Sequence, residues 1–229
     1  KTADACVSAG NTGALMAISH FVLKTVPGID RAAIIASFPV IYGKSRALDL
    51  GANVDSCAEQ LVQFAIMGTV IAETIDGIEC PRVGILNVGS EEIKGNDQVK
   101  QTAQLLAEHK EINYIGFVEG DALFVCGDAD IIVCNGFVGN IALKTSEGIA
   151  KFISSKLKSE FKKSIFTKMA GLSSAKVLNS FKKVVDPRRY NGASLLGLKG
   201  IIIKSHGWAD SFAFKTYVQI ALTEVKKDV

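Results

Sequence analysis

A segment near the start of the chain combines glycine with small polar residues in a pattern suited to an anion site. The segment SAGNTG follows an apolar β-type run and contains Gly10, Asn11 and Gly13. Glycines let the backbone approach an anion, and a helix beginning at Asn11 presents free N–H groups at the positive end of its dipole. Ser8 and Thr12 add hydroxyl donors. We predict that this loop binds phosphate, although a tight turn with an N-cap explains the same residues.

Two further loops each place a polar side chain after an apolar run. Lys94 lies in NVGSEEIKGND, and Asn140 ends CNGFVGN at the expected start of a helix. A lysine there can hold phosphate or stabilise charge that develops on an attacked carbonyl or a departing thiolate, and an asparagine can donate to an oxyanion. Simple solvation of Lys94 and helix capping by Asn140 are the competing interpretations.

Three more residues follow expected strands and are predicted to contact substrate. Asn53 lies in LDLGANVD, Asn96 in EIKGND and His206 in KSHG. His206 can bind phosphate or move a proton, while stabilisation of its turn explains it equally well. No Ser–His–Asp grouping follows from the spacing, and the chain contains neither GxGxxG nor GxxxxGKS/T.

Cysteine and histidine usage argues against a metal centre. The five cysteines are scattered and never spaced as CxxC, and there are only three histidines. We therefore predict no metal and no cofactor. Cys6 and Cys134 lie in apolar runs, where cysteine usually acts as a small buried hydrophobe rather than a catalytic thiol.

Length and composition are those of a soluble globular protein. The 229 residues are 48% hydrophobic and 21% charged, and we expect them to form a single α/β domain. No apolar stretch reaches the roughly 18 residues needed to span a bilayer, and the first residues lack the pattern of a secretory signal. A cytoplasmic location is the expectation.

Charge is unevenly distributed along the chain. Residues 141–199 contain thirteen Lys/Arg and three Asp/Glu, a net charge of +10, whereas the remainder has thirteen and twenty, a net charge of −7. Such segregation indicates an anionic partner at the basic helical segment. Nucleic acid, an anionic membrane and an acidic protein are all candidates, and a well-solvated helical face is the plain alternative.

Apolar periodicity predicts the elements that must position these residues. Strands are expected at residues 4–8, 31–40, 47–50, 82–88, 112–118, 131–134 and 200–204. Helices are expected at residues 11–26, 58–78, 97–109, 138–163, 173–184 and 211–226. This alternation predicts a mostly parallel sheet flanked by helices, with the polar loops gathered at the carboxyl ends of the strands. Because the first strand begins almost at residue 1, we expect the chain to be part of a longer one.

Taken together, the loops resemble the phosphate acyltransferase family of bacterial phospholipid synthesis. The matching stretches are VSAGNTGALMA, LDLGANVD, QFAIMG, RVGILNVGSEEIKGND, GFVGNIALK and YNGASLLGLKGIIIKSHG. They occur in the family's order and span nearly the whole chain. The chain departs from the family pattern by lacking an opening DAMGGD-type loop, by Asn135 in place of an aspartate, and by GFVEGDA where members read GNxEGRD.

The resemblance implies a three-layer α/β/α fold like that of phosphate acetyltransferase and isopropylmalate dehydrogenase, in a homodimer. It implies transfer of a fatty acyl group from acyl carrier protein to inorganic phosphate, giving an acyl phosphate. The family's proposed catalytic lysine and asparagine fall on Lys94 and Asn140. Acyl carrier protein is acidic, so the basic segment has a natural partner and no nucleic acid is required.

Two other functions are weighed against this one. A nicotinamide-dependent decarboxylating dehydrogenase of the related fold would need a cluster of metal-binding carboxylates, and the sequence offers none. A non-catalytic fragment would only bind carrier protein or membrane. For the membrane, Phe166, Met169 and Leu172 form an apolar turn between lysine-rich helices, a combination suited to peripheral contact with anionic lipid.

Overall fold

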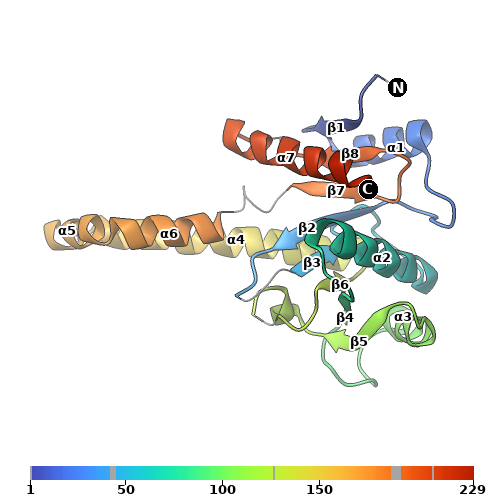
Figure 1. The fold of residues 1–229 in the computed structure, drawn as a ribbon. Coiled ribbons are helices and arrows are strands. Elements are labelled where there is room, and N and C mark those ends of the chain that lie inside the picture. Colours follow the sequence, from blue (N-terminus) through green and yellow to red (C-terminus); the bar gives the residue numbers. More distant parts are fainter. Residues whose placement is uncertain (1, 42–44, 126, 187–191, 208) are drawn as a thin grey trace.

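Within residues 2–41, 45–125, 127–186, 192–207 and 209–229, which the computed structural model describes, eight strands form one sheet with helices on both faces (Figure 1). The strands are β1 Ala5–Ser8, β2 Ala33–Phe38, β3 Ser45–Leu48, β4 Arg82–Leu86, β5 Asn113–Val118, β6 Ile131–Val133, β7 Ala193–Leu196 and β8 Ile201–Lys204. The helices are α1 Thr12–Leu23, α2 Ala58–Ile71, α3 Asp97–Glu108, α4 Gly136–Phe161, α5 Ile165–Ser173, α6 Ala175–Val185 and α7 Ser211–Lys227. A π-helical turn, η1 Ala72–Asp76, extends α2, and a 3₁₀ turn, η2 Gly120–Leu123, follows β5.

The helices divide between the two faces of the sheet and bury separate cores. On one face, α2 and α3 pack on β3, β4 and β6 around Phe64 and Ile131, and α7 packs on β1 and β8 around Tyr217. On the other face, α1 and α4 contribute Leu15 and Leu143 to a core over β2 and β8. The predicted three-layer α/β/α fold is therefore confirmed.

Strand direction differs from the prediction in the middle of the sheet. The order is β1-β8-β7-β2-β3-β6-β4-β5, and the pairings of β7 with β8, β7 with β2 and β2 with β3 are antiparallel. The other four pairings are parallel. Consequently β1, β2 and β8 run opposite to β3, β4, β5 and β6, and their carboxyl ends do not share one edge as predicted. The direction reverses between β2 and β3, which follow each other in the chain and pair antiparallel. In addition, β7, a four-residue strand too short for a periodicity signal, lies between β2 and β8 and forms a hairpin with β8 through Gly197 at φ 85°.

Asparagine side chains start three of the helices. Asn11 accepts a hydrogen bond from the backbone N–H of Ala14, and Asn96 accepts one from Val99, so both predicted starts are confirmed. Helix α4 begins at Gly136 rather than at residue 138, because Asn135 is its N-cap. The capping interpretation of Asn140 is therefore wrong. Each such cap contributes about 1 kcal/mol.

Helices α4, α5 and α6 form an arm that projects from the body of the molecule (Figure 1). The segment around Phe166, which was predicted as a turn, is helix α5, because the side chains of Ser164 and Thr167 form a capping box at its start. None of the residues of α5 is buried. The arm holds most of the basic segment, of which residues 187–191 lie outside the described part of the chain.

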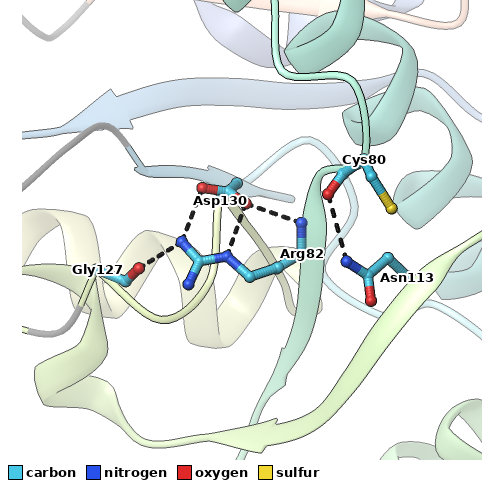
Figure 2. Close-up of polar contacts among 5 residues, drawn as sticks. All are labelled: Cys80, Arg82, Asn113, Gly127 and Asp130. Carbon is cyan, nitrogen blue, oxygen red and sulfur yellow. Dashed lines mark hydrogen bonds and ion pairs between the residues drawn. The ribbon is translucent and has the colours of Figure 1, made fainter.

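Two separate sets of hydrogen bonds join β4 to β6 and to β5 where these strands begin (Figure 2). The guanidinium of Arg82 makes two hydrogen bonds to the carboxylate of Asp130, at 3.0 and 3.1 Å, and a third to the carbonyl of Gly127. The side chain of Asn113 donates to the carbonyl of Cys80 at 3.3 Å. Because the carboxylate also accepts the Arg82 backbone N–H, Asp130 fixes the beginning of β4 beside the beginning of β6.

None of the described helices is both long and apolar enough to cross a membrane. Among the same residues, no group of three or more His, Cys, Asp or Glu side chains is arranged to hold a metal ion. The described structure therefore offers neither a membrane-spanning helix nor a ready metal cluster of that kind.

The loop after β3 is built on a fully buried carboxylate. Asp49 accepts hydrogen bonds from the backbone N–H groups of Ile34, Gly51, Ala52 and Asn53, and from the side-chain amide of Asn53, at 2.6–3.2 Å. Burial raises the pKa of Asp49, and these hydrogen bonds act in the opposite direction. The side chain of Asp49 thus joins the start of β2 to the turn formed by residues 49–53.

Helix α4 lies directly on this loop. The N–H of Gly136 donates to the carbonyl of Asn53 at 2.9 Å, and a Cβ at Gly139 would collide with the backbone oxygen of Asp49. Glycine at these two positions therefore permits the close approach. The position of the start of α4 depends on the conformation that Asp49 imposes.

We expect Asp49→Ala to be strongly destabilising, because it leaves buried N–H groups without an acceptor. The loss should be about 3 kcal/mol or more in the free energy of unfolding, measured by urea denaturation. Asp55→Ala, at an exposed position in the same loop, is the control and should change stability by less than about 0.5 kcal/mol. Equal effects of the two substitutions would contradict the structural role of Asp49.

Candidate functional site

The first turns of α4 lie between two hollows of different character. The first, which we call the cationic cavity, has a volume of about 300 Å³ and lies between α1, α4 and the middle of the sheet. Its lining residues are Thr12, Ile34, Ala36, Leu50, Gly51, Asn140, Leu143, Lys144, Ala193, Lys204, Ser205 and His206. The lining thus includes two lysines and a histidine, and none of these twelve residues is acidic.

Asn140 reaches this cavity from the second turn of α4. A Cβ added at Gly51 would lie 3.2–3.4 Å from three side-chain atoms of Asn140, so the amide rests against the loop after β3. The predicted oxyanion donor therefore lines a cavity that also contains cationic groups.

A buried glutamate orients two of the cationic side chains. Glu147, with 8% of its surface exposed, lies one turn after Lys144 on α4. Its carboxylate contacts Lys144 Nζ at 3.0 Å and His206 Nε2 at 3.5 Å. Burial alone would raise the pKa of Glu147, but the hydrogen bonds and charges of His206 and Lys144 lower it to about 2. The carboxylate is therefore ionised at neutral pH and fixes both side chains.

Lys204 is the second lysine of the cavity. It ends β8, is partly buried, and donates to the carbonyl of Ser205. Burial and the nearby charge of Lys144 lower the pKa of Lys204. Because both lysines line the same cavity, an anion placed between them would be attracted by two positive charges.

The second hollow, the apolar pocket, lies on the other side of the start of α4. It has a volume of about 470 Å³ and is lined by Leu61, Ile85, Leu86, Asn87, Val88, Gly95, Asn96, Val99, Cys134, Asn135 and Val138. Its walls are mostly aliphatic, and the polar groups of Asn87, Asn96 and Asn135 lie among them. Such a composition suits a hydrocarbon chain with one polar end.

Lys94 borders the apolar pocket rather than the cationic cavity. It is not among the residues that line either hollow, but its neighbours Gly95 and Asn96 line the apolar pocket. Lys94 Nζ pairs with Glu91 at 2.8 Å, and this hydrogen bond raises the pKa of Lys94. The lysine is therefore a cation at neutral pH. Lys94 and Asn140, the two predicted catalytic residues, thus lie beside different hollows.

The predicted phosphate loop contributes one lining residue. Thr12, the first residue of α1, lines the cationic cavity, whereas Gly10, Asn11 and Gly13 are exposed. The hydroxyl of Ser8 accepts a hydrogen bond from the N–H of Gly10 at 3.2 Å, so it shapes the turn. Phosphate binding by the whole loop stays a prediction.

The three residues predicted to contact substrate have different surroundings. His206 lines the cationic cavity. Asn96 lines the apolar pocket while capping α3. Asn53 is 5% exposed, and its amide donates to the carbonyl of Ala32 and to Asp49. Its observed contacts are those of a structural residue, and its contact with substrate stays a prediction.

The cysteines are divided between the surface and the core. Cys134 is buried, as predicted, and its pKa is raised by burial. Cys6 is exposed, because β1 is the edge strand of the sheet, so the prediction of burial was wrong there. Cys126 lies outside the described residues.

Sequence reasoning missed Lys144, Glu147 and Lys204. Lys144 and Glu147 are three residues apart on the helix that carries Asn140, and Lys204 ends an apolar run two residues before His206. Both spacings are visible in the sequence. The sequence does not show that these side chains lie near one another, because this depends on α4 and β8 meeting across the unpredicted middle of the sheet.

The low pKa of Glu147 predicts a specific dependence of stability on pH. Because the pKa in the folded protein is about 2 and the ordinary value is 4.5, the stabilisation is complete above about pH 4.5 and is lost as the pH falls towards 2. We expect the free energy of unfolding of the wild type to fall by up to about 3 kcal/mol more than that of Glu147→Gln over this range. If the free energies of unfolding of the wild type and of Glu147→Gln changed equally with pH, the ion pairs of Glu147 would be contradicted.

Comparison with known proteins identifies the family of this chain. The family model described as "Fatty acid synthesis protein" matches residues 1–229. A protein named phosphate acyltransferase from Alkalilimnicola ehrlichii is 58% identical over 227 residues, and one from Methylococcus capsulatus is 60% identical. Each alignment covers 99% of this chain and 66% of the relative, so the chain spans 66% of the length of these relatives.

Solved structures with low sequence identity share the fold. A phosphotransacetylase from Streptococcus pyogenes superimposes with a TM-score of 0.64 at 19% identity, covering 99% of this chain and 63% of that one. The EutD phosphotransacetylase from Staphylococcus aureus gives a TM-score of 0.60 at 20% identity, covering 98% and 63%. With the match of the family model over every residue and relatives of 58–60% identity, this chain belongs to the fatty acid synthesis protein family, whose members include the phosphate acyltransferases.

Proposed function

We propose that this chain belongs to an acyltransferase that converts acyl-acyl carrier protein and inorganic phosphate to an acyl phosphate for phospholipid synthesis. The observation that carries the proposal is the pairing of a cationic cavity with an apolar pocket on opposite sides of the start of α4. A reaction between an inorganic anion and a fatty acyl group requires both environments close together. The name of the relatives, phosphate acyltransferase, supports the same reaction.

The proposed chemistry is direct displacement without a covalent enzyme intermediate. An oxygen of hydrogen phosphate attacks the thioester carbon, and the carbon–sulfur bond then breaks to leave the thiolate of the carrier protein. The proton of hydrogen phosphate ends on that sulfur, so the products are an acyl phosphate and a free thiol. No general base is needed, because the phosphate is already anionic.

Lys94 and Asn140 are proposed to stabilise charge during this reaction. Asn140 donates to the oxyanion from the side of the cationic cavity, and Lys94, kept protonated by Glu91, stabilises the departing thiolate from the side of the apolar pocket. The thioester then lies over the start of α4, between the two hollows.

The competing functions have less support. A nicotinamide-dependent decarboxylating dehydrogenase requires a metal held by carboxylates, whereas the cationic cavity is lined by lysines and a histidine. A non-catalytic fragment has no need for a cavity that combines Lys144, Lys204 and Asn140 with buried apolar walls. An assay of the free thiol released from acyl-acyl carrier protein separates all three functions.

The assay measures free thiol released from acyl-acyl carrier protein with and without inorganic phosphate. We expect release that depends on phosphate, and a decrease of roughly 10²–10³-fold in Lys94→Ala and in Asn140→Ala. Lys110→Ala, which removes an exposed lysine near the end of α3, is the control and should retain wild-type turnover. Near-normal turnover in both active-site variants would remove these roles, and release without phosphate would contradict the reaction.

Carrier protein and membrane are the proposed partners of the basic arm. Lysines are distributed along α4, α5 and α6, and acyl carrier protein is acidic, so their charges are complementary. On α5, Phe166, Met169 and Leu172 are 81%, 63% and 77% exposed. An exposed apolar surface beside lysines suits shallow insertion into an anionic membrane. A homodimer is the other proposed assembly, because Phe152 and Ile153 of α4 are also exposed.

Flotation with liposomes tests the membrane contact. We expect the chain to float with vesicles containing anionic lipid, and Phe166→Ser with Leu172→Ser to reduce the floated fraction several-fold, because each exchange removes an inserted apolar side chain. Phe21→Ser, at an 83% exposed position of α1, is the matched control. Flotation that is insensitive to salt, or equal loss in the control, would count against electrostatic docking of the arm.

A further inference from the structure

The described lining of the cationic cavity carries positive charge. Lys144 and Lys204 contribute two ammonium groups, and none of the twelve described lining residues is acidic. Glu147 is buried, is not among these lining residues, and contacts both Lys144 and His206. Among the described contacts, the carboxylate of Glu147 pairs with Lys144 and His206, and Lys204 donates instead to the carbonyl of Ser205.

The dimensions and walls of the cavity suit a small oxyanion. A volume of about 300 Å³ holds roughly ten groups the size of a water molecule, enough for a five-atom anion with several waters. The floor is formed by Ile34 and Ala36 of β2, with Leu50 and Leu143 beside them. Apolar walls lower the local dielectric constant, so a charge held between the lysines interacts more strongly than it would in water.

Neutral donors complete the arrangement around the lysines. Thr12 offers a hydroxyl at the start of α1, and Asn140 offers an amide from α4. Lys144 is oriented by Glu147, and Lys204 by its hydrogen bond to the carbonyl of Ser205. These donors come from three separate elements, so their convergence is a property of the fold rather than of one loop.

We propose that inorganic phosphate binds in the cationic cavity between the ammonium groups of Lys144 and Lys204, with Thr12, Asn140 and His206 as further donors. This inference rests on the proposed function and assigns the site of its nucleophile. It places phosphate between the lysines of α4 and β8, and not on the exposed glycines of SAGNTG, where the sequence predicted it. It also separates phosphate from Lys94, which lies beside the apolar pocket.

Phosphate binding by the chain alone, without acyl-acyl carrier protein, tests the site. The broadening of the ³¹P resonance of inorganic phosphate on titration with protein reports the dissociation constant. We expect Lys144→Gln and Lys204→Gln each to weaken binding by about 10-fold or more, because each removes one charge-assisted hydrogen bond. Lys110→Gln, at an exposed position near the end of α3 and outside both the cavity and the arm, is the matched control and should bind like the wild type.

Circular dichroism and thermal unfolding establish that each variant is folded before its affinity is compared. Lys144 is about half exposed, so its replacement should leave the fold intact even if Lys204→Gln does not fold. Unchanged affinity in a folded Lys144→Gln, or an equal decrease in the Lys110 control, would overturn the inference. So would a loss of binding in Lys94→Gln with none in the two cavity variants. If binding depends on the cavity lysines but no acyl phosphate forms, the site stands and the proposed reaction fails.

Discussion

The buried carboxylate of Asp49 is the interaction on which the arrangement of both hollows depends. It accepts four backbone N–H groups and one side-chain amide, and it thereby sets the conformation of residues 49–53 and joins them to β2. Hydrogen bonds to a charged group contribute about 1.5–3 kcal/mol each, enough to offset the cost of removing one carboxylate from water when five of them are made. Helix α4 rests on this loop through Gly136 and Gly139. Its start in turn separates the cationic cavity from the apolar pocket.

The polar lining of one hollow and the apolar lining of the other include residues only a few positions apart on α4. Asn140 and Lys144 face one hollow, whereas Asn135 and Val138 face the other. Residues two positions apart on a helix point in nearly opposite directions, so a single helical turn can present a polar and an apolar surface to different ligands. Glu147 keeps Lys144 on the polar side, and its low pKa keeps that restraint in place at neutral pH.

Local signals in the sequence predicted local structure well. Asn11 was identified as the N-cap of a helix because capping depends on residues only three positions apart. Most strands were visible as apolar runs, since a strand covered on both faces has few polar residues. Lys94, Asn140 and His206 were singled out by their positions after such runs, and Asn140 and His206 indeed meet in one cavity.

Long-range pairing was not predictable in the same way. The four residues of β7 are too few to show periodicity, and the antiparallel pairing of β2 with β3, at which the strand direction reverses, is not visible in the apolar pattern of either strand. The cluster of Lys144, Glu147 and Lys204 depends on that topology, because it joins α4 to the end of β8. Asn53 looked like a ligand-binding residue by position, yet burial under the loop gives it structural contacts.

The central claim is that the cavity beside α4 holds the phosphate that accepts the acyl group. Arsenate has the charge and shape of phosphate, and the anomalous scattering of arsenic locates it directly in a crystal soaked with it. The account predicts one strong arsenic peak within hydrogen-bonding distance of Lys144 Nζ and Lys204 Nζ. A peak beside Lys94 or on the glycines of SAGNTG, with none between the two lysines, would contradict it.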